Sequence, residues 1–168
     1  MPWTHSTNLK GPSMLRVARL PAALSTTSNS SWLTLFTTPL AAQQVLSFAA
    51  ELYFSSGANN TGLVTTLSGP ATPQAVIHNL VTGESLTSFR NLTASSYDTP
   101  LIGTTSAGSS VLRAQVSGTV ENGASAGNLS LRFRSEVAGL ACIQASLAVG
   151  CDNIALIKGK HYLLIVAC

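Results

Sequence analysis

The sequence predicts an all-β protein, built as a sandwich or a barrel. Its 168 residues suffice for one domain, with room for a second only if both are small. Hydrophobic and polar residues alternate with the period of two that strands require, and turn signals recur about every ten residues. A series of about eight to ten short strands is typical of a sandwich or barrel rather than of βαβ units.

Residues 1–13 are predicted to form an extended N-terminal arm. They are polar, show neither a helical nor a strand period, and contain Pro2, Gly11 and Pro12. Proline and the residue before it favour extended or turn backbone. We expect a single domain over residues 14–168.

The clearest strand signal lies between residues 44 and 55. One side of this segment is entirely apolar and carries Leu46, Phe48, Ala50, Leu52 and Phe54. The other side carries Val45, Ser47, Ala49, Glu51 and Tyr53. Such alternation predicts a strand with one buried face.

Two later segments, 110–121 and 128–137, alternate in the same way. Their expected apolar faces consist of Leu112, Ala114, Val116, Gly118 and Val120 in the first segment and Leu129, Leu131, Phe133 and Val137 in the second. Asn122-Gly123 and Ala126-Gly127 lie between the segments and supply turn residues. This arrangement predicts that the two segments pair as a β-hairpin.

Shorter alternating runs predict the remaining strands. These are Met14–Leu20, Ser31–Thr37, Gln74–Val81, Ser85–Leu92, Cys142–Ala148, Asn153–Ile157 and His161–Val166. Residues 56–62 are rich in Ser, Gly and Asn and are expected to form a turn. A short helix stays open at residues 40–44 or 138–148.

The composition favours a protein that assembles with others. Only 9% of the residues are charged, against about a quarter in an ordinary soluble domain. The chain has 22 serines and 18 threonines, so its surface offers little charge repulsion to keep copies apart. This disfavours an isolated, highly soluble enzyme. The 45% of hydrophobic residues argues against general disorder.

Charge and hydropathy exclude two classes of partner. The formal net charge is +3, but the nine basic residues are scattered along the chain rather than clustered as nucleic-acid binding requires. No apolar run reaches the roughly 18 residues of a membrane span, and the first residues contain no apolar stretch typical of a secretory signal. We therefore expect neither nucleic acid nor a membrane as a partner.

No residue pattern indicates catalysis. Motifs for nucleotide binding and for hydrolases are absent. A Ser–His–Asp set could combine His78 or His161 with Asp98 or Asp152, but with 22 serines such proximity is uninformative. His78 is expected on the surface or at a sheet edge. We expect no catalytic residue, no cofactor and no metal.

The three cysteines argue against a disulfide scaffold or a zinc site, since their number is odd and no C-x-x-C pair occurs. Cys142 lies in an apolar run and is expected to behave as a small buried apolar residue. A Cys142–Cys151 bridge and an intersubunit bridge through Cys168 both stay open.

The few charged residues supply candidates for a subunit interface. If the predicted hairpin forms, three arginines and a glutamate lie on adjacent strands, while Glu51 and Glu121 fall on comparable faces. These side chains either form a solvated sheet face or pair across an interface, where sparse charges give register and specificity. The candidates are Glu51, Arg113, Arg132, Arg134 and Glu136.

Several short segments carry a resemblance to a known type of module. They are LSFAAELYF at 46–54, NTG at 60–62, GPATP at 69–73, SYDTP at 96–100, TSAGSSVL at 105–112, VSG at 116–118 and LRFRSE at 131–136. Together they resemble a β-sandwich module of tailed-bacteriophage structural proteins, chiefly head-fibre and capsid-decoration proteins, with similar modules at tail-fibre tips. The pattern is also similar to trimeric jelly rolls of the tumour-necrosis-factor and complement C1q type.

This resemblance covers residues 45–137 and implies an antiparallel β-sandwich of jelly-roll type that forms a homotrimer. It implies a virion protein, assembled in the host cytoplasm, that binds the outside of a phage capsid and stabilises it. The N-terminal segment resembles a capsid-proximal arm, although no collagen-like repeats follow it. Contacts with the major capsid protein would come from Trp3, Thr4, His5, Asn8, Leu9 and Lys10.

Other roles stay open. A receptor- or glycan-binding tip of a tail fibre, with a host-surface glycan as partner, predicts that aromatic side chains such as Trp32, Tyr53 or Tyr97 are exposed in a groove. A small-virus coat protein needs a basic RNA-binding arm, whereas Lys10 is the only Lys or Arg in residues 1–13. An enzyme would be indicated by hydrolase activity that His161→Ala abolishes.

Overall fold

The structure is a computed structural model that describes residues 14–19, 24–108, 110–138, 141–143 and 162–167. The described residues contain strands and no helix. The strands are β1 (Met14–Arg19), β2 (Leu24–Thr26), β3 (Leu33–Leu40), β4 (Val45–Ser56), β5 (Thr61–Ser68), β6 (Ala75–Gly83), β7 (Phe89–Ala94), β8 (Leu101–Thr105), β9 (Leu112–Glu121), β10 (Gly127–Ser135), β11 (Ala141–Ile143) and β12 (Tyr162–Ala167).

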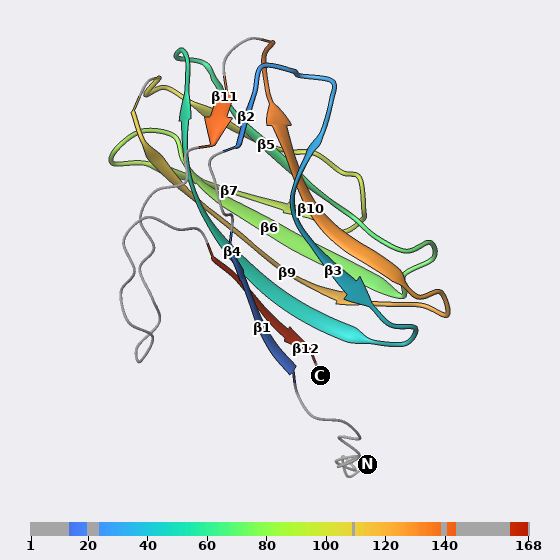
Figure 1. The fold of residues 1–168 in the computed structure, drawn as a ribbon. Helices are drawn as coiled ribbons and strands as arrows, with labels where there is room; N and C mark the ends of the chain where they lie inside the picture. The colour runs from blue at the N-terminus through green and yellow to red at the C-terminus, as the bar shows by residue number, and fades with distance from the viewer. Residues whose placement is uncertain (1–13, 20–23, 109, 139–140, 144–161, 168) are drawn as a thin grey trace, which may run out of the picture.

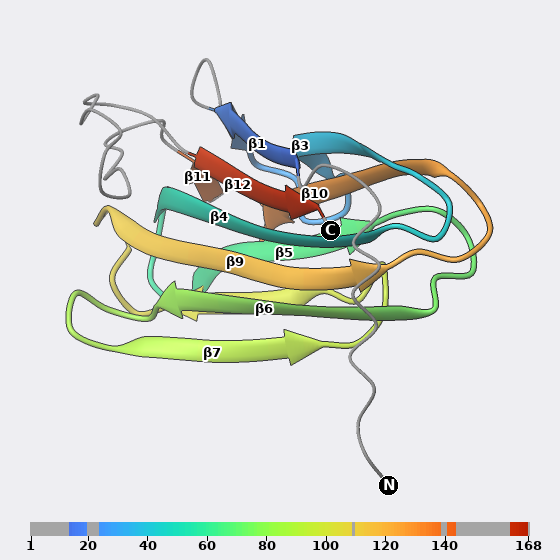
Figure 2. The ribbon, with the colours of Figure 1, turned by 90° about the horizontal axis from the view of Figure 1, so that it is seen from below.

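The strands form two antiparallel sheets that pack face to face (Figures 1 and 2). Sheet A has the order β1-β12-β4-β9-β6-β7, and the short β11 pairs with both β2 and β4. Sheet B has the order β3-β10-β5-β8. The predicted all-β sandwich is therefore confirmed.

The core lies between the sheets and is built by alternation along each strand. On β4 the predicted inward residues are all buried, and the same holds for the apolar residues of β9 and β10. Each fully buried Leu or Phe contributes about 1.5–3 kcal/mol relative to an exposed one. The large Leu and Phe side chains that are fully buried are Leu40, Leu46, Leu52, Phe54, Leu63, Leu67, Leu80 and Phe133.

The predicted hairpin of residues 110–121 and 128–137 is wrong. β9 pairs with β4 and β6 in sheet A, whereas β10 pairs with β3 and β5 in sheet B. Both strands direct their apolar sides into the same core from opposite sheets, so the loop between them crosses from one sheet to the other. Alternation alone gives the inward side of a strand but not its neighbour.

Residues 122–126 make this crossing against the loop that connects β3 to β4. The Gln43 amide donates to the Gly123 carbonyl at 2.8 Å, and the Asn122 amide donates to the Gln44 carbonyl at 2.9 Å. The buried Asn122 side chain donates to the carbonyls of Ala41 at 2.7 Å and Ser125 at 2.8 Å. Two crossings between the sheets are thereby joined at one end of the sandwich.

Other element boundaries differ from the prediction as well. The strands β2, β5 and β8 were not predicted, and β7 begins at Phe89 rather than at residue 85. The expectation that Val137 belongs to an apolar strand face is wrong, because β10 ends at Ser135 and Val137 is 43% exposed. Residues 41–44 form a turn instead of a short helix. Of the segment 138–148, residues 141–143 form β11, while residues 144–148 and the predicted strand 153–157 lie outside the described residues.

Candidate functional site

The five predicted interface residues lie on two opposite outer faces of the sandwich. Glu51 on β4 and Arg113 on β9 belong to sheet A. Arg132 and Arg134 lie on β10 of sheet B, and Glu136 directly follows that strand. The expectation that Arg113 shares a face with the residues of 132–136 is wrong, because it depended on the hairpin that does not form.

On sheet A, one carboxylate oxygen of Glu51 binds two neighbouring side chains. Arg113 Nε lies 2.9 Å from Glu51 Oε1, and the Tyr53 hydroxyl donates to the same oxygen at 2.8 Å. Burial, and then the hydrogen bond to Glu51, raises the pKa of Tyr53. The Arg113 side chain is 52% exposed, so this ion pair contributes about 1 kcal/mol or less.

On sheet B, two arginines lie over one tryptophan. The guanidinium carbons of Arg134 and Arg132 lie 4.9 Å and 5.7 Å from the centre of the Trp32 ring. Arg132 also forms an ion pair with Asp98, and Arg134 donates to the Asn29 carbonyl. We call Trp32, Asp98, Arg132 and Arg134 the arginine–tryptophan strip.

The arginine–tryptophan strip lies beside outward-facing residues that are nevertheless buried. Thr66 and Val64 on β5 are the cross-strand neighbours of Arg132 and Arg134, and both are 0% exposed. The Thr66 hydroxyl donates to the Thr99 carbonyl at 3.0 Å, which brings the loop between β7 and β8 onto this face. The arginine–tryptophan strip therefore covers Thr66 and Val64 and holds this loop against sheet B.

Glu136 has its own contact at the end of this face. The Thr104 hydroxyl donates to Glu136 Oε1 at 2.7 Å, and the Glu136 amide donates to the Gly62 carbonyl at 3.0 Å. Each predicted interface residue thus has a partner within its own chain.

The expectation that His78 is a surface or edge residue is wrong. Its side chain is 0% exposed and points from β6 into the core, in line with Val76 and Leu80. Nε2 lies 3.3 Å from the Ser96 carbonyl oxygen, and burial lowers the pKa of His78. Asp98, its suggested catalytic partner, pairs instead with Arg132.

The three aromatic residues proposed for a glycan groove are not brought together. Tyr53 lies on the outer face of sheet A, and Trp32 lies at the outer face of sheet B. Tyr97 packs in the loop between β7 and β8, where a Cβ on Gly69 would lie only 2.3 Å from its ring. Burial raises the pKa of Tyr97 to about 12.

Several predicted residues cannot be placed. The arm residues Trp3, Thr4, His5, Asn8, Leu9 and Lys10 lie outside the described residues, as do His161, Asp152, Cys151 and Cys168. The backbone of Cys142 lies in β11.

The described residues show neither a metal-binding cluster nor a membrane-spanning helix. They contain no group of three or more His, Cys, Asp or Glu that could hold a metal ion. Among these same residues, no helix is long and apolar enough to cross a membrane.

Comparisons with known proteins give no relative for this chain. No protein-family model matches it, and neither a curated protein nor a solved structure does so.

Sequence reasoning missed two parts of the arginine–tryptophan strip. Asp98 and Trp32 were considered only for catalysis and for a glycan groove, yet both contact Arg132. A usable signal for Trp32 was its position at the start of the predicted strand Ser31–Thr37. No such signal exists for Asp98, because it reaches Arg132 from a loop that is distant in sequence.

Proposed function

We propose that this chain is a structural protein of a bacteriophage particle, a capsid-decoration or head-fibre protein that binds the outside of the capsid as a homotrimer and stabilises it. The observation that carries this proposal is the order of the strands in the two sheets. The sequence resemblance adds the viral context, and the composition agrees with a protein that works in an assembly.

We infer further that the sandwich is of jelly-roll type. Strands β3 to β10 pair as β3 with β10, β4 with β9, β5 with β8 and β6 with β7. Successive pairs belong alternately to sheet B and sheet A. This is the arrangement expected when one long antiparallel ladder is rolled up, with contacts of β10 to β5 and of β9 to β6 closing the sheets. Double-sheet jelly rolls of eight strands are typical of viral capsid and lectin domains.

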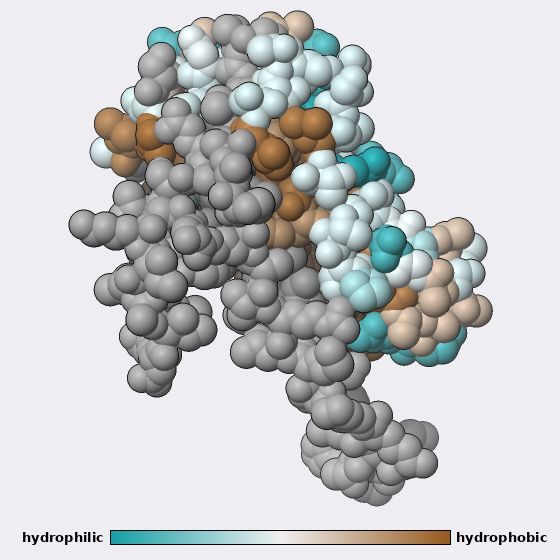
Figure 3. Space-filling view, viewed as in Figure 1, coloured by the Kyte–Doolittle hydropathy of each residue, from teal (hydrophilic) through white to brown (hydrophobic). Residues whose placement is uncertain are grey.

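The surface supports a role in assembly. Exposed positions are mainly small hydroxyl and amide residues, and Figure 3 shows pale described atoms with brown confined to patches. A decoration protein with such a surface would stabilise a capsid by burying area between capsid subunits. Permanent interfaces of this kind bury more than about 2,000 Å² in total.

Binding of empty phage heads tests this proposal. The full chain is expected to sediment with heads of its own phage in a saturable manner, and Trp3→Ala with Leu9→Ala in the arm should reduce this binding at least tenfold. Leu86→Ser, at an exposed residue of the turn between β6 and β7, serves as the control and should bind normally. A full chain that stays in the supernatant at every concentration would contradict the proposal.

A further inference from the structure

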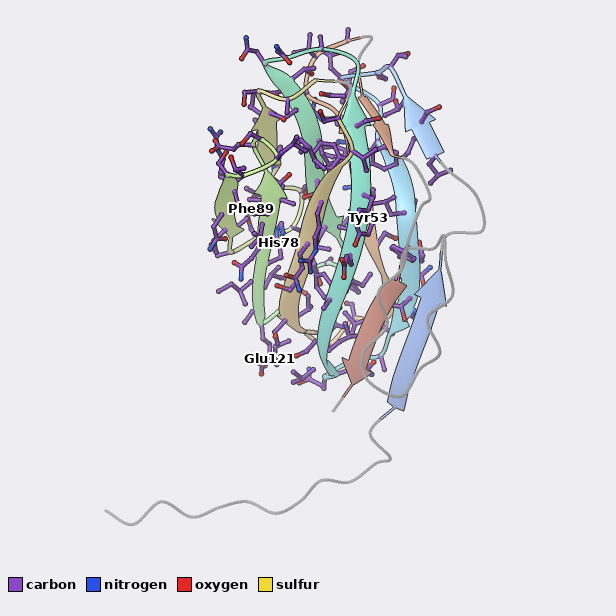
Figure 4. All side chains as sticks on the ribbon, turned by 90° about the vertical axis from the view of Figure 1, so that its left-hand side faces the viewer. Tyr53, His78, Phe89 and Glu121 are labelled. Carbon is purple, nitrogen blue, oxygen red and sulfur yellow. The ribbon has the colours of Figure 1, made fainter. Side chains whose placement is uncertain are left out.

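The outward side of β9, in the outer face of sheet A, carries opposite charges at its two ends. The outward residues of β9 are Arg113, Gln115, Ser117, Thr119 and Glu121. Charges occur only at the two ends, about 27 Å apart at roughly 3.4 Å per residue. Figure 4 shows Tyr53, the neighbour of Arg113, and Glu121 toward different ends of this face.

The neighbouring strands extend this pattern across the face. Beside Gln115 lie Glu51 on β4 and Val81 on β6. Beside Thr119 lie Ser47 and Ile77. Across β4, β9 and β6, the cross-strand rows are Tyr53–Arg113, Glu51–Gln115–Val81, Ala49–Ser117–Asn79, Ser47–Thr119–Ile77 and Val45–Glu121–Ala75.

We propose that two copies of this chain pack through the outer face of sheet A about a two-fold axis that crosses the strands at Ser117. The axis lies in the plane of the interface and runs across the strands. β9 of one copy therefore faces β9 of the second copy, and the two strands run in opposite directions. Arg113 of each copy then lies opposite Glu121 of the other. Such an interface is isologous, which means that each of its contacts occurs twice.

The same operation places Glu51, which keeps its ion pair with Arg113, opposite Ser47, and it brings apolar residues of the other rows together. Val81 lies opposite Ile77, and Tyr53 lies opposite Val45, so apolar side chains meet apolar ones. The middle row of Ala49, Ser117 and Asn79 faces itself. Its residues are small or uncharged, which allows two sheets to approach to the usual spacing of about 10 Å.

The alternative in which the facing strands run in the same direction is disfavoured. It would place Arg113 opposite Arg113 and Glu121 opposite Glu121, and like charges facing each other across an interface are repulsive. The charges at the ends of β9 therefore select one relative orientation.

Two exposed side chains on this face, Glu121 and Ile77, favour this contact. Glu121 is exposed, and it has no ion-pair partner among the residues that the structure describes. Ile77 on β6, in the row of Thr119, is 51% exposed. A second copy would give Glu121 a cationic partner and remove Ile77 from water.

The size of the sheet is sufficient for a stable contact. The six strands contain between 6 and 12 residues each, so they are about 20–40 Å long, and at a spacing of about 4.8 Å they give a face of roughly 800 Å². A standard protein interface buries about 800 Å² on each partner. Two such faces pack in an aligned manner, at about 30° to each other.

This contact goes beyond the proposed function, because it does not require a phage particle. It also constrains the homotrimer, since a face used about a two-fold axis has no room for a third copy. A trimer must use another surface, and the two-fold contact then joins two trimers.

Charge exchange tests the contact in the full chain. We expect the unmodified protein to sediment as two copies, or as six if trimers also form. Arg113→Glu and Glu121→Arg should each weaken self-association at least tenfold, because each change places like charges opposite each other at two symmetric positions. The double variant restores both ion pairs with reversed sign and should recover self-association.

Arg90→Glu is the matched control. Arg90 donates to Glu84 at 2.8 Å at the β6–β7 turn, away from β9, so this equal change of charge should leave self-association unaltered. Thermal unfolding of each variant checks that it is folded. Three results would each overturn the proposal: an unmodified protein that is monomeric or only trimeric, single variants that associate normally, or a double variant that fails to recover.

Discussion

At the scale of single residues, burial of His78 makes the fold sensitive to acid. Its side chain is fully buried on β6 and its pKa is lowered from the ordinary value of about 6.5. Because the unfolded chain binds the proton more readily than the folded one, stability from this residue is complete above about pH 6.5 and declines as the pH falls below that value.

His78→Leu should therefore flatten part of the pH dependence. We expect the unfolding midpoint of the unmodified protein to fall more steeply than that of His78→Leu between about pH 6.5 and pH 5, since leucine has no proton to bind. Urea unfolding at a series of pH values measures the difference. Parallel curves for the two proteins would contradict this assignment.

Gly62 illustrates a residue that is required for steric reasons. A Cβ at this position of β5 would lie 1.9 Å from the carbonyl oxygen of Gly103 on β8. Gly62→Ala should lower the free energy of unfolding by about 1–3 kcal/mol, as overpacking in a rigid region does. Gly83→Ala is the control, because its Cβ would meet Leu112 at an ordinary 3.4 Å. Urea unfolding of both variants compares them, and equal midpoints would rule out the steric explanation.

At the scale of elements, the inward side of each long strand was predictable and its partner was not. The alternation of Phe48 and Phe54 on β4, and of Leu131 and Phe133 on β10, follows from which residues must leave water. Which sheet a strand joins depends on contacts distant in sequence. The turn residues between β9 and β10 serve a crossing between sheets as well as they would serve a hairpin.

Two of the strands that were not predicted, β5 and β8, have unusual compositions. β5 contains Gly62 and three threonines, and β8 contains Gly103 and two threonines, so neither shows a clean apolar alternation. Seven of the eight residues of β5 are buried, because its outward side is covered as well as its inward side. For the candidate site, Glu51 was placed on the polar side of its strand, as the structure has it, whereas Arg113 was wrongly grouped with residues 132–136 because of the error in strand pairing.

The two crossings at one end of the sandwich depend on one buried amide. Asn122→Ala removes the donors to the Ala41 and Ser125 carbonyls, and we expect a loss of about 2 kcal/mol in the free energy of unfolding. Asn128→Ala, at an exposed position of β10, is the control and should change stability by less than about 0.5 kcal/mol. Chemical denaturation measures both, and similar losses would show that the crossings do not depend on Asn122.

At the scale of the whole molecule, the two outer faces differ in how their charges are used. On sheet B, Arg132 and Arg134 are occupied by Trp32, Asp98 and a backbone carbonyl of the same chain. On sheet A, Glu121 is exposed and Arg113 is half exposed. The outer face of sheet A is therefore better suited to contact another copy, whereas the arginines on the outer face of sheet B already bind residues of their own chain.

We propose that this sandwich stabilises a phage head by adding contacts to its outside. The most direct measurement is the temperature at which heads release their packaged DNA, with and without the full chain bound. We predict that heads lacking the protein release DNA at a lower temperature and that adding the purified full chain restores the higher one. Heads that release DNA at the same temperature in both states would contradict the account.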